Sequence, residues 1–310
     1  MVDEGVALSK YLDDAYDDIR RGKVVETVEA LIAHLRKALE SSADLSWRST
    51  MKALCQTHPI LRVLHEDPYT WRAFHKPRGY AGDAVLLDFV YTGCPPADTS
   101  ALGRKIFEVT TTCSASRSVR ERKDVIANAI DAIASRRPDA RVLSLACGHL
   151  REAELSDAVC AGAVSEYLAL DQDEQSLAVV EREHAGRGIR TLHTSIRKLL
   201  RGDEIGVSLS DLDFVYAAGL FDYLPDGIAS RLIARMFAML RPGGSILIAN
   251  YVPGTEERGY MDAIMDWELI YREREDLERI ASVVDISRTA SRRSYLDGHG
   301  NVAYLELTAA

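Results

Sequence analysis

Apolar residues recur at intervals of three and four positions along the first 120 residues of the chain. One set comprises Leu8, Tyr11, Leu12, Ala15 and Ile19, and a second set runs from Val28 to Leu39. This spacing places each set on one face of a helix. Residues 41–44 separate the second helix from a third, for which Asp44 is the expected N-cap. We therefore predict a helical N-terminal domain over residues 1–120.

From residue 121 onward, short apolar runs alternate with helical stretches, which is typical of an α/β domain with a parallel sheet. A helix is expected from Arg258 to Ser282, followed by two strands that flank the turn sequence 297–301. That turn predicts an antiparallel hairpin at the end of the sheet. We therefore predict a second domain over residues 121–310. Its strands are expected near residues 141–146, 166–170, 189–193, 212–217, 244–250, 284–292 and 301–308.

Composition indicates a globular protein rather than a membrane or exported one. The chain has 310 residues, of which 47% are hydrophobic, so it can bury a large core. No run approaches the ~20 apolar residues of a membrane span, and residues 1–5 lack the features of a signal peptide. Five cysteines at scattered spacings favour reduced thiols over a disulfide framework or a zinc site. We expect a cytoplasmic protein without a membrane partner or a bound metal.

The formal net charge of -9 argues against a nucleic-acid partner, because nucleic-acid binders usually present a basic face. Two basic clusters, Arg20–Lys23 and Arg117–Lys123, are interleaved with or flanked by acids. We interpret them as solvated helix faces. The expected partner is a small molecule, and the oligomeric state is left open, a homodimer included.

The strand expected near residue 146 carries the most informative chemistry. Its apolar residues lead into Ala146, Cys147 and Gly148, a tight turn that should open a helix. The next apolar run ends in Asp171. A carboxylate about twenty residues after such a glycine suits a ribose, because its oxygens accept hydrogen bonds from the ribose hydroxyls. The pattern therefore predicts a cofactor that contains a nucleoside.

The number of glycines distinguishes two classes of such cofactors. A dinucleotide needs several, because the backbone must approach its pyrophosphate closely. Here only Gly148 is present, and the next positions carry His149, Leu150 and Arg151. A cofactor without phosphate groups is favoured, and a dinucleotide-dependent oxidoreductase is the rival interpretation.

In these segments the chain resembles the class I methyltransferases that use S-adenosyl-L-methionine (SAM). Ala146-Cys147-Gly148 is similar to their first motif, and Asp171 to their ribose-binding acid. Residues 211–224 resemble their fourth strand with its following loop, and residues 240–250 their helix-end turn and fifth strand. The resemblance implies a Rossmann-like, seven-stranded sheet with a closing hairpin, SAM as cofactor and transferase activity. The family's second glycine is absent, which leaves open how the methionine end is held.

The resemblance also implies which residues contact the cofactor. Ala146, Cys147 and Gly148 would form the turn, with Asp171 at the ribose and Gln172 beside the adenosine. Ser195 and Ile196 would lie near the adenine, where Thr194 and Ser195 replace an acidic residue. Ala218, Gly219 and Tyr223 would approach the methionine portion. For Cys147, Ala218 and Gly219 the alternative is tight packing alone.

The segment 74–83 stands out within the N-terminal domain, since it holds two glycines, a proline and four ionisable side chains. It is either a structural turn between helices or a lid loop that brings Arg78 and Tyr80 over the cofactor. With the helices around it, the segment resembles bacterial proteins of the 3-hydroxypalmitic acid methyl ester synthase group. That resemblance implies a helical lid domain and methylation of a fatty-acid-like carboxylate.

The acceptor decides which side chains the chemistry needs. A carboxylate needs no general base, only cations or hydrogen-bond donors such as Arg78, Tyr80, Arg117 or Arg272. An amine would need a base, for which His75, His149 and Asp222 are candidates. Aromatic residues could line an apolar acceptor pocket or simply fill the core: Tyr80, Tyr251, Trp267 and Tyr271. We predict carboxyl O-methylation of a small acid first and amine N-methylation second, with a non-catalytic SAM-binding protein as a further alternative.

Overall fold

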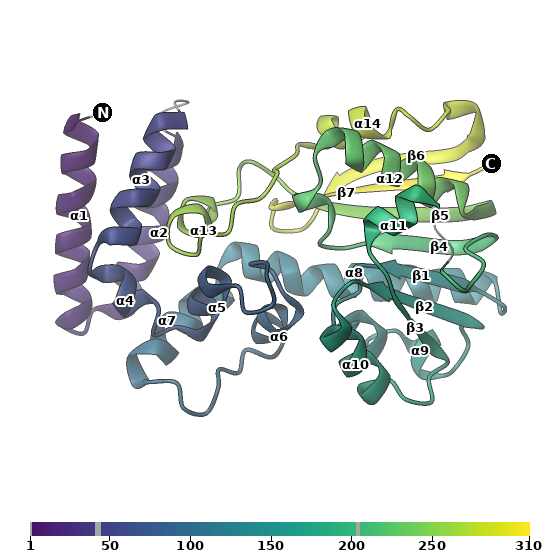
Figure 1. Cartoon of the computed structure of the whole chain (residues 1–310), viewed down its shortest axis with the longest axis horizontal. Helices are drawn as coiled ribbons and strands as arrows, with labels where there is room; N and C mark the ends of the chain where they lie inside the picture. The colour runs from purple at the N-terminus through teal and green to yellow at the C-terminus, as the bar shows by residue number, and fades with distance from the viewer. Residues whose placement is uncertain (1, 41–44, 203–204) are drawn as a thin grey trace. The chain divides into compact units, whose positions relative to one another are not determined.

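The computed structural model describes residues 2–40, 45–202 and 205–310, and the chain divides into two compact units (Figure 1). Met1–Val119 and Gly254–Glu268 form a helical unit, and Arg120–Pro253 and Leu269–Ala310 form a sheet unit. Asp44, the expected N-cap, lies outside the described residues. Across the described ranges, none of the helices combines the length and the apolar character that a membrane span requires.

The helical unit contains the predicted amphipathic helices. Leu8, Leu12, Ala15 and Ile19 are buried along α1, and Val28 to Leu39 supply the buried face of α2. Tyr11 is partly buried and stacks on His34, with ring centroids 3.7 Å apart. The helices of this unit are α1 (Val2–Arg20), α2 (Val24–Glu40), α3 (Leu45–Thr57), α4 (Ile60–Leu64), α5 (Pro68–His75), α6 (Ala84–Thr92), α7 (Ala101–Thr112) and α13 (Arg258–Ala263). Helix α8 (Ser114–Arg136) begins here and continues into the sheet unit.

The segment Gly254–Glu268 leaves the sheet unit after its fifth strand and packs within the helical unit. A Cβ on Gly259 would stand 2.4 Å from the Leu35 carbonyl, so glycine permits the close approach of α13 to α2. The Glu257 carboxylate accepts hydrogen bonds from the backbone amides of Ser114 (2.8 Å) and Ala115 (3.2 Å) at the start of α8. The segment is therefore an integral part of the helical unit, although the sequence placed it in the second domain.

The expected helix from Arg258 to Ser282 is wrong. The structure has α13 and α14 (Arg274–Ala281), with residues 264–273 not helical between them. Asp266 is left-handed, with φ 48°, and the Ile270 amide bonds the Asp222 carbonyl rather than a helical partner (2.7 Å). These backbone bonds to the sheet unit compete with helix formation and break the periodic pattern.

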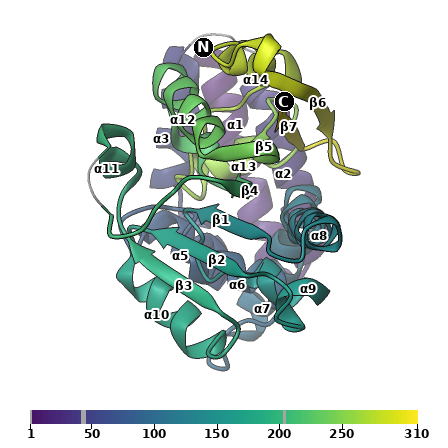
Figure 2. The same cartoon turned by 90° about the vertical axis from the view of Figure 1, so that its right-hand side faces the viewer.

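The sheet unit holds one seven-stranded sheet in the order β3-β2-β1-β4-β5-β7-β6 (Figure 2). The first five strands are parallel, and β7 pairs antiparallel with both β5 and β6. This confirms the predicted α/β fold with its closing hairpin. The strands are β1 (Arg141–Leu145), β2 (Glu166–Asp171), β3 (Ile189–His193), β4 (Leu212–Ala217), β5 (Leu240–Tyr251), β6 (Thr289–Leu296) and β7 (Val302–Ala309).

The two faces of the sheet differ in chemistry. One face, with the helices α11, α12 and α14, forms an apolar core that includes Leu168, Val215, Ile248 and Leu305. Strand residues alternate between faces, so their neighbours Tyr167, Tyr216 and Tyr304 point to the opposite face. The remaining elements are α9 (Asp157–Cys160), α10 (Glu174–Glu183), α11 (Ile196–Arg201), α12 (Asp226–Ala238) and the 3-10 turns η1 (Arg151–Glu154), η2 (Phe221–Tyr223) and η3 (Ile286–Arg288).

Three boundaries differ from the sequence-based ones. Strand β5 begins at Leu240, because Pro242–Gly244 continue the strand through an irregularity beside β4 instead of ending a helix. Strand β6 begins at Thr289, since η3 occupies residues that were expected to be extended. The turn at Gly148 opens only η1, not a full helix.

Candidate functional site

The turn after β1 has a left-handed backbone at alternate positions. Ala146 (φ 53°), Gly148 (φ 56°) and Leu150 (φ 55°) all lie in the left-handed region. Only glycine adopts this region without a steric cost. The turn thus keeps its special geometry although two of the three positions carry side chains. Such strain persists where the surrounding structure enforces it, and it is often found at ligand sites.

Asp171 at the end of β2 holds this turn. One of its carboxylate oxygens accepts a hydrogen bond from the Gly148 amide (2.8 Å), and the other from the Asp173 amide (2.9 Å). The residue is 5% exposed. Burial raises the pKa of Asp171, and the two amide hydrogen bonds lower it. A carboxylate offers about four lone-pair sites, so two remain for the vicinal hydroxyls of a sugar.

The end of β3 lies beside Asp171, because the Thr194 amide donates to the Asp171 carbonyl (2.9 Å). The Thr194 hydroxyl is buried, and it has no hydrogen-bond partner among the residues that the structure describes. Ser195 caps α11, its hydroxyl accepting from the Lys198 amide (3.3 Å), and Ile196 begins that helix. Gln172 is exposed. The predicted adenosine contacts are thus collected at one edge of the sheet.

Arg122 of α8 approaches the loop after β4. A Cβ on Gly219 would lie 3.7 Å from the nearer guanidinium nitrogen of Arg122, which is only 4% exposed. Arg122 was not among the predicted site residues, because Arg117–Lys123 was interpreted as a solvated helix face. Helical periodicity could have found it, since Arg122 falls on the buried stripe of Val119 and Ile126. Ala218 and Gly219 are half-buried, and Tyr223 is 37% exposed.

Two buried carboxyl groups accompany Arg122. Burial raises the pKa of Asp222 to about 6, while the amide of Tyr251 (2.7 Å) and the guanidinium of Arg122 lower it. Burial also raises the pKa of Glu152, while the Tyr216 hydroxyl, which donates to it, and Arg122 lower it. Arg122 therefore provides buried positive charge where β1 and β4 end. Asp222 accepts from the Tyr251 backbone amide, and its role as a general base stays a prediction.

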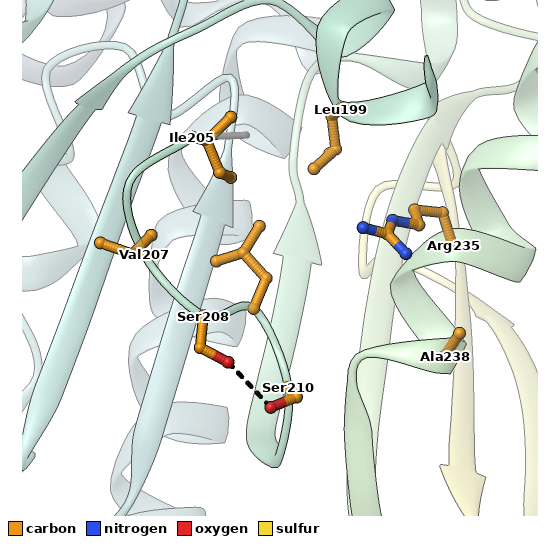
Figure 3. Close-up of a pocket in the computed structure, with 8 residues that line it drawn as sticks. Leu199, Ile205, Val207, Ser208, Ser210, Arg235 and Ala238 are labelled. Carbon is orange, nitrogen blue, oxygen red and sulfur yellow. Dashed lines mark hydrogen bonds between the residues drawn. The ribbon is translucent and has the colours of Figure 1, made fainter. Parts of the chain in front are cut away.

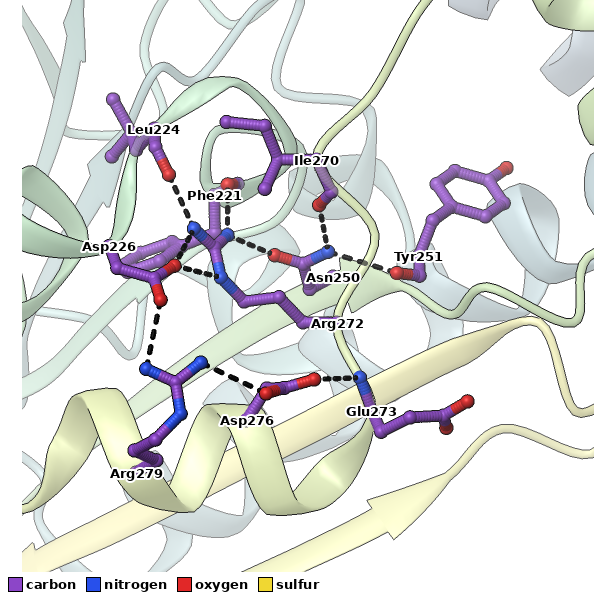
Figure 4. Close-up of polar contacts among 10 residues, drawn as sticks. All are labelled: Phe221, Leu224, Asp226, Asn250, Tyr251, Ile270, Arg272, Glu273, Asp276 and Arg279. Atoms are coloured by element: carbon purple, nitrogen blue, oxygen red, sulfur yellow. Dashed lines mark hydrogen bonds and ion pairs between the residues drawn. The ribbon is translucent and has the colours of Figure 1, made fainter. Parts of the chain in front are cut away.

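Arg272 does not take the predicted acceptor-positioning role. It is 2% exposed, and all five of its N–H groups donate within the sheet unit (Figure 4). The acceptors are the carbonyls of Phe221 (2.8 Å) and Leu224 (2.5 Å), the side-chain oxygen of Asn250 (2.8 Å) and the Asp226 carboxylate (2.7 and 3.1 Å). Arg272 ties the loop after β4 to the end of β5 and has no donor left for a substrate.

The remaining acceptor candidates are divided between the units. Arg78, Tyr80, Arg117 and Trp267 belong to the helical unit, whereas Tyr251 and Tyr271 belong to the sheet unit. Arg117 is exposed and donates to the Thr112 carbonyl (2.8 Å). Trp267 is buried, as is Tyr251. No side-chain role in acceptor binding is established for these six residues, and they remain predictions.

The segment 74–83 forms a turn between helices. Lys76 (φ 50°) ends α5 and Gly79 (φ 87°) is also left-handed. Asp83 caps α6, accepting from the Leu86 amide (2.9 Å), and pairs with Arg72 (2.8 Å). His75 stacks on Trp71, and its ring nitrogen bonds the Trp71 carbonyl (2.9 Å). His149, the third base candidate, is buried.

A cavity of about 350 Å³ lies within the sheet unit (Figure 3). It is bounded by α11, the segment that precedes β4 and the end of α12. That segment enters β4 at its amino end, whereas ligands of open α/β sheets bind at the carboxyl ends of the strands. The cavity contains none of the predicted site residues. Its lining residues are Leu199, Ile205, Val207, Ser208, Leu209, Ser210, Arg235 and Ala238.

Solved structures share the fold at low sequence identity. A possible exported protein from Bordetella parapertussis is 16% identical, with a TM-score of 0.60, and the match covers 91% of this chain and 96% of that one. Magnesium protoporphyrin IX methyltransferase (ChlM) from Synechocystis PCC 6803, with SAH bound, is 12% identical, with a TM-score of 0.47 and coverage of 63% and 87%. N-methyltransferase NodS from Bradyrhizobium japonicum WM9, in complex with S-adenosyl-L-homocysteine, is 14% identical, with a TM-score of 0.43 and coverage of 62% and 87%. No protein-family model and no curated protein matches the chain.

Proposed function

We propose that this chain is a SAM-dependent methyltransferase that acts on a small molecule. The observation that carries the proposal is the buried Asp171 carboxylate, which holds the left-handed turn at Gly148. The Asp171 carboxylate can accept hydrogen bonds from ribose hydroxyls, and it lies beside a backbone turn that a ligand can approach closely. Both are at the carboxyl ends of the parallel strands. The same turn lacks the additional glycines that a pyrophosphate needs, which disfavours a dinucleotide.

The residues at this edge fit the parts of SAM. Asp171 retains lone pairs for the ribose hydroxyls, and the buried Thr194 hydroxyl, which lacks a partner within the described ranges, suits the adenine. Ser195, Ile196 and Gln172 complete that side. When bound, SAM would supply an electrophilic sulfonium methyl group.

We assign the methionine end to Arg122, the buried cation beside Gly219. A guanidinium suits a carboxylate, because its fixed fork matches two carboxylate oxygens. The Arg122 guanidinium lowers the pKa of both Glu152 and Asp222, so these carboxyl groups can balance its charge before the ligand arrives. This arrangement would replace the missing second glycine.

The chain's own contribution to methyl transfer would be alignment and exclusion of water. A carboxylate acceptor would be placed by Arg78, Tyr80 and Arg117, which makes carboxyl O-methylation of a fatty-acid-like or other small acid the first acceptor chemistry. An amine acceptor is the second. A cytoplasmic location remains part of the proposal; the five cysteines are free thiols.

Calorimetric titration with SAM, S-adenosylhomocysteine, methylthioadenosine and NAD tests the proposal. We expect the first two to bind, and D171N to weaken both by about tenfold or more. D171N keeps an oxygen for the Gly148 amide, and D285N serves as its exposed control. R122M should weaken S-adenosylhomocysteine but not methylthioadenosine, which lacks the amino-acid end, whereas R136M on the same helix should change neither.

Binding of NAD without SAM would overturn the proposal in favour of an oxidoreductase. Tight SAM binding without methyl transfer to any small acid or amine would favour the non-catalytic alternative. Equal weakening of S-adenosylhomocysteine and methylthioadenosine by R122M would remove Arg122 from the methionine end.

A further inference from the structure

Two polar side chains at the base of the β6–β7 hairpin point to the same face of the sheet. The Asp297 amide donates to the Val302 carbonyl (2.9 Å), so these residues are cross-strand neighbours. Tyr304 follows Val302 by two positions. Cross-strand neighbours and residues two apart share a face. Asp297 and Tyr304 are therefore diagonal neighbours on the face opposite the apolar core, and Tyr295 lies directly opposite Tyr304.

Among the described residues, both side chains carry a buried polar atom without a hydrogen-bond partner. Tyr304 is 0% exposed and Asp297 8%. One Asp297 oxygen accepts from the amides of Asn301 (2.8 Å) and Val302 (3.0 Å). In the part of the chain that the structure describes, neither the other oxygen nor the Tyr304 hydroxyl has a hydrogen-bond partner. Leaving such groups unsatisfied is costly, so the pair is suited to an external partner.

Helix α8 adds a second carboxylate to this group. Glu121 accepts from the Gly298 amide at both oxygens (3.0 and 3.2 Å) and lies 3.7 Å from His299. Burial raises the pKa of Tyr304; Arg122 lowers it, and Asp297 and Glu121 raise it, which places these charges around the hydroxyl. We call Asp297, Tyr304, Glu121 and His299 the hairpin cluster. The cluster brings the two carboxyl groups of Asp297 and Glu121 together, with the Arg122 guanidinium beside them.

The hairpin cluster borders the proposed cofactor edge. Val302 pairs with Tyr251, the last residue of β5, so the hairpin turn lies at the carboxyl end of the parallel strands. Arg122, which follows Glu121 on α8, reaches Gly219 after β4. A compound held by the cluster would thus lie next to the place assigned to the methionine end.

We propose that the hairpin cluster is a binding site for a protonated amine on the methyl acceptor. The Asp297 oxygen without a partner only accepts hydrogen bonds, and the Tyr304 hydroxyl can accept one. An ammonium group offers three donors and a positive charge that two carboxylates favour. A carboxylate in the same place would meet repulsion from Asp297 and Glu121. The proposal concerns recognition of the amine, whichever atom of the compound receives the methyl group. It rests on the proposed function only in that the bound amine is taken to belong to the methyl acceptor.

Entry requires the hairpin turn to shift, because Tyr304 is fully covered. Residues 298–300 of the turn are exposed and include two glycines, of which Gly300 has φ 74°. Glu121 is 33% exposed and His299 36%. The cluster therefore meets solvent at Glu121 and His299, and a small movement of the turn would open it.

The test uses hexylamine, hexanoate and hexanol, which share one alkyl chain and differ in charge. Binding to the full-length protein is followed by ligand-observed NMR, with and without saturating S-adenosylhomocysteine. We expect hexylamine to bind most tightly, and D297N and Y304F each to weaken it by about tenfold. D297N keeps an oxygen for the two turn amides. Y295F is the matched control, because the Tyr295 hydroxyl donates to Glu306 (2.7 Å) on the same hairpin.

Thermal unfolding of the free variants supplies a second readout. Y304F removes a hydroxyl that makes no hydrogen bond within the described ranges, so its Tm should stay level or rise. A lower Tm for Y304F with unchanged hexylamine binding would show an ordered water only, which overturns the proposal. Hexanoate or hexanol binding as tightly as hexylamine would also overturn it. Failure to bind S-adenosylhomocysteine would instead reject the proposed function, while hexylamine binding without it would still support the amine site.

Discussion

At the scale of single residues, the turn after β1 is strained, because residues with side chains occupy left-handed backbone positions. Ala146 is exposed and left-handed (φ 53°). A left-handed alanine costs about 1–2 kcal/mol, and glycine costs about 0.5–1 kcal/mol through the unfolded chain. We expect A146G to raise the free energy of unfolding by up to about 1 kcal/mol, measured by urea denaturation. A178G, in the exposed middle of α10, should lower it by about 1 kcal/mol. Equal losses in both variants would show that Ala146 is unstrained.

Asp222 predicts a pH dependence at the same scale. Burial raises its pKa from 3.8 to about 6 in the folded protein. Below pH 3.8 the Asp222 carboxyl is protonated in both the folded and the unfolded state. Between pH 3.8 and about 6 it is ionised in the unfolded chain but still protonated in the folded protein, so folding stability falls as the pH rises. D222N removes this loss. The free energy of unfolding of D222N minus that of the wild type should therefore increase from pH 4 to 6 and then level off.

Asp226 provides a control for which the pH dependence of folding stability has the opposite sign. Hydrogen bonds from Arg272 and Arg279 lower its pKa, so its contribution is present above pH 3.8 and lost as the pH falls through the lowered value. D226N should lower stability at neutral pH and approach the wild type in acid. Parallel pH curves for D222N and the wild type would contradict the assignment at Asp222.

At the scale of elements, the sequence predicted the strands whose pattern follows from burial and missed the helix boundaries that depend on tertiary contacts. Strands β1 to β4 were expected within one residue of their ends, and β1, β2 and β4 are short, largely apolar and buried runs. The helix over Arg258–Ser282 failed, because residues 264–273 bond the sheet unit through Ile270 and Arg272, a long-range demand that periodicity does not carry. For the site, the glycine turn and Asp171 could be predicted from spacing. Arg122 was missed although it falls on the buried stripe of α8. The hairpin cluster could not be predicted, since it depends on how α8 meets the sheet.

Helix α13 yields a prediction about close packing. A Cβ on Gly259 would stand 2.4 Å from backbone atoms of Leu35, which cannot move without displacing α2. G259A should therefore lower the free energy of unfolding by about 1–3 kcal/mol. G5A is the control in the same unit: its Cβ would only touch the Leu54 side chain at 3.7 Å, inside α1, so helix propensity should raise stability by up to about 1 kcal/mol. Similar values for both variants, measured by urea denaturation, would contradict the close approach.

At the scale of the whole molecule, the chain passes between the two units three times, at residues 119–120, 253–254 and 268–269. A division at residue 120, as predicted from the hydrophobic pattern, therefore does not separate two self-sufficient parts. The helical unit needs Gly254–Glu268 for polar as well as apolar contacts. Glu257 satisfies the amides of Ser114 and Ala115, and the buried Tyr260 hydroxyl lies 3.2 Å from that of Thr70.

The last prediction follows from this connectivity: a fragment of residues 1–119 should not fold cooperatively alone. It lacks the segment whose Gly259, Tyr260 and Trp267 are buried in the helical unit, and it exposes the apolar surface of α2 that α13 covers, which costs about 25 cal/mol for each Å². Adding the peptide 254–268 should restore a sigmoidal thermal transition in far-UV circular dichroism. A scrambled peptide of the same composition should not. A cooperative transition of the fragment alone, unchanged by the peptide, would show that the helical unit is complete before residue 120 and that Gly254–Glu268 packs on an already folded surface.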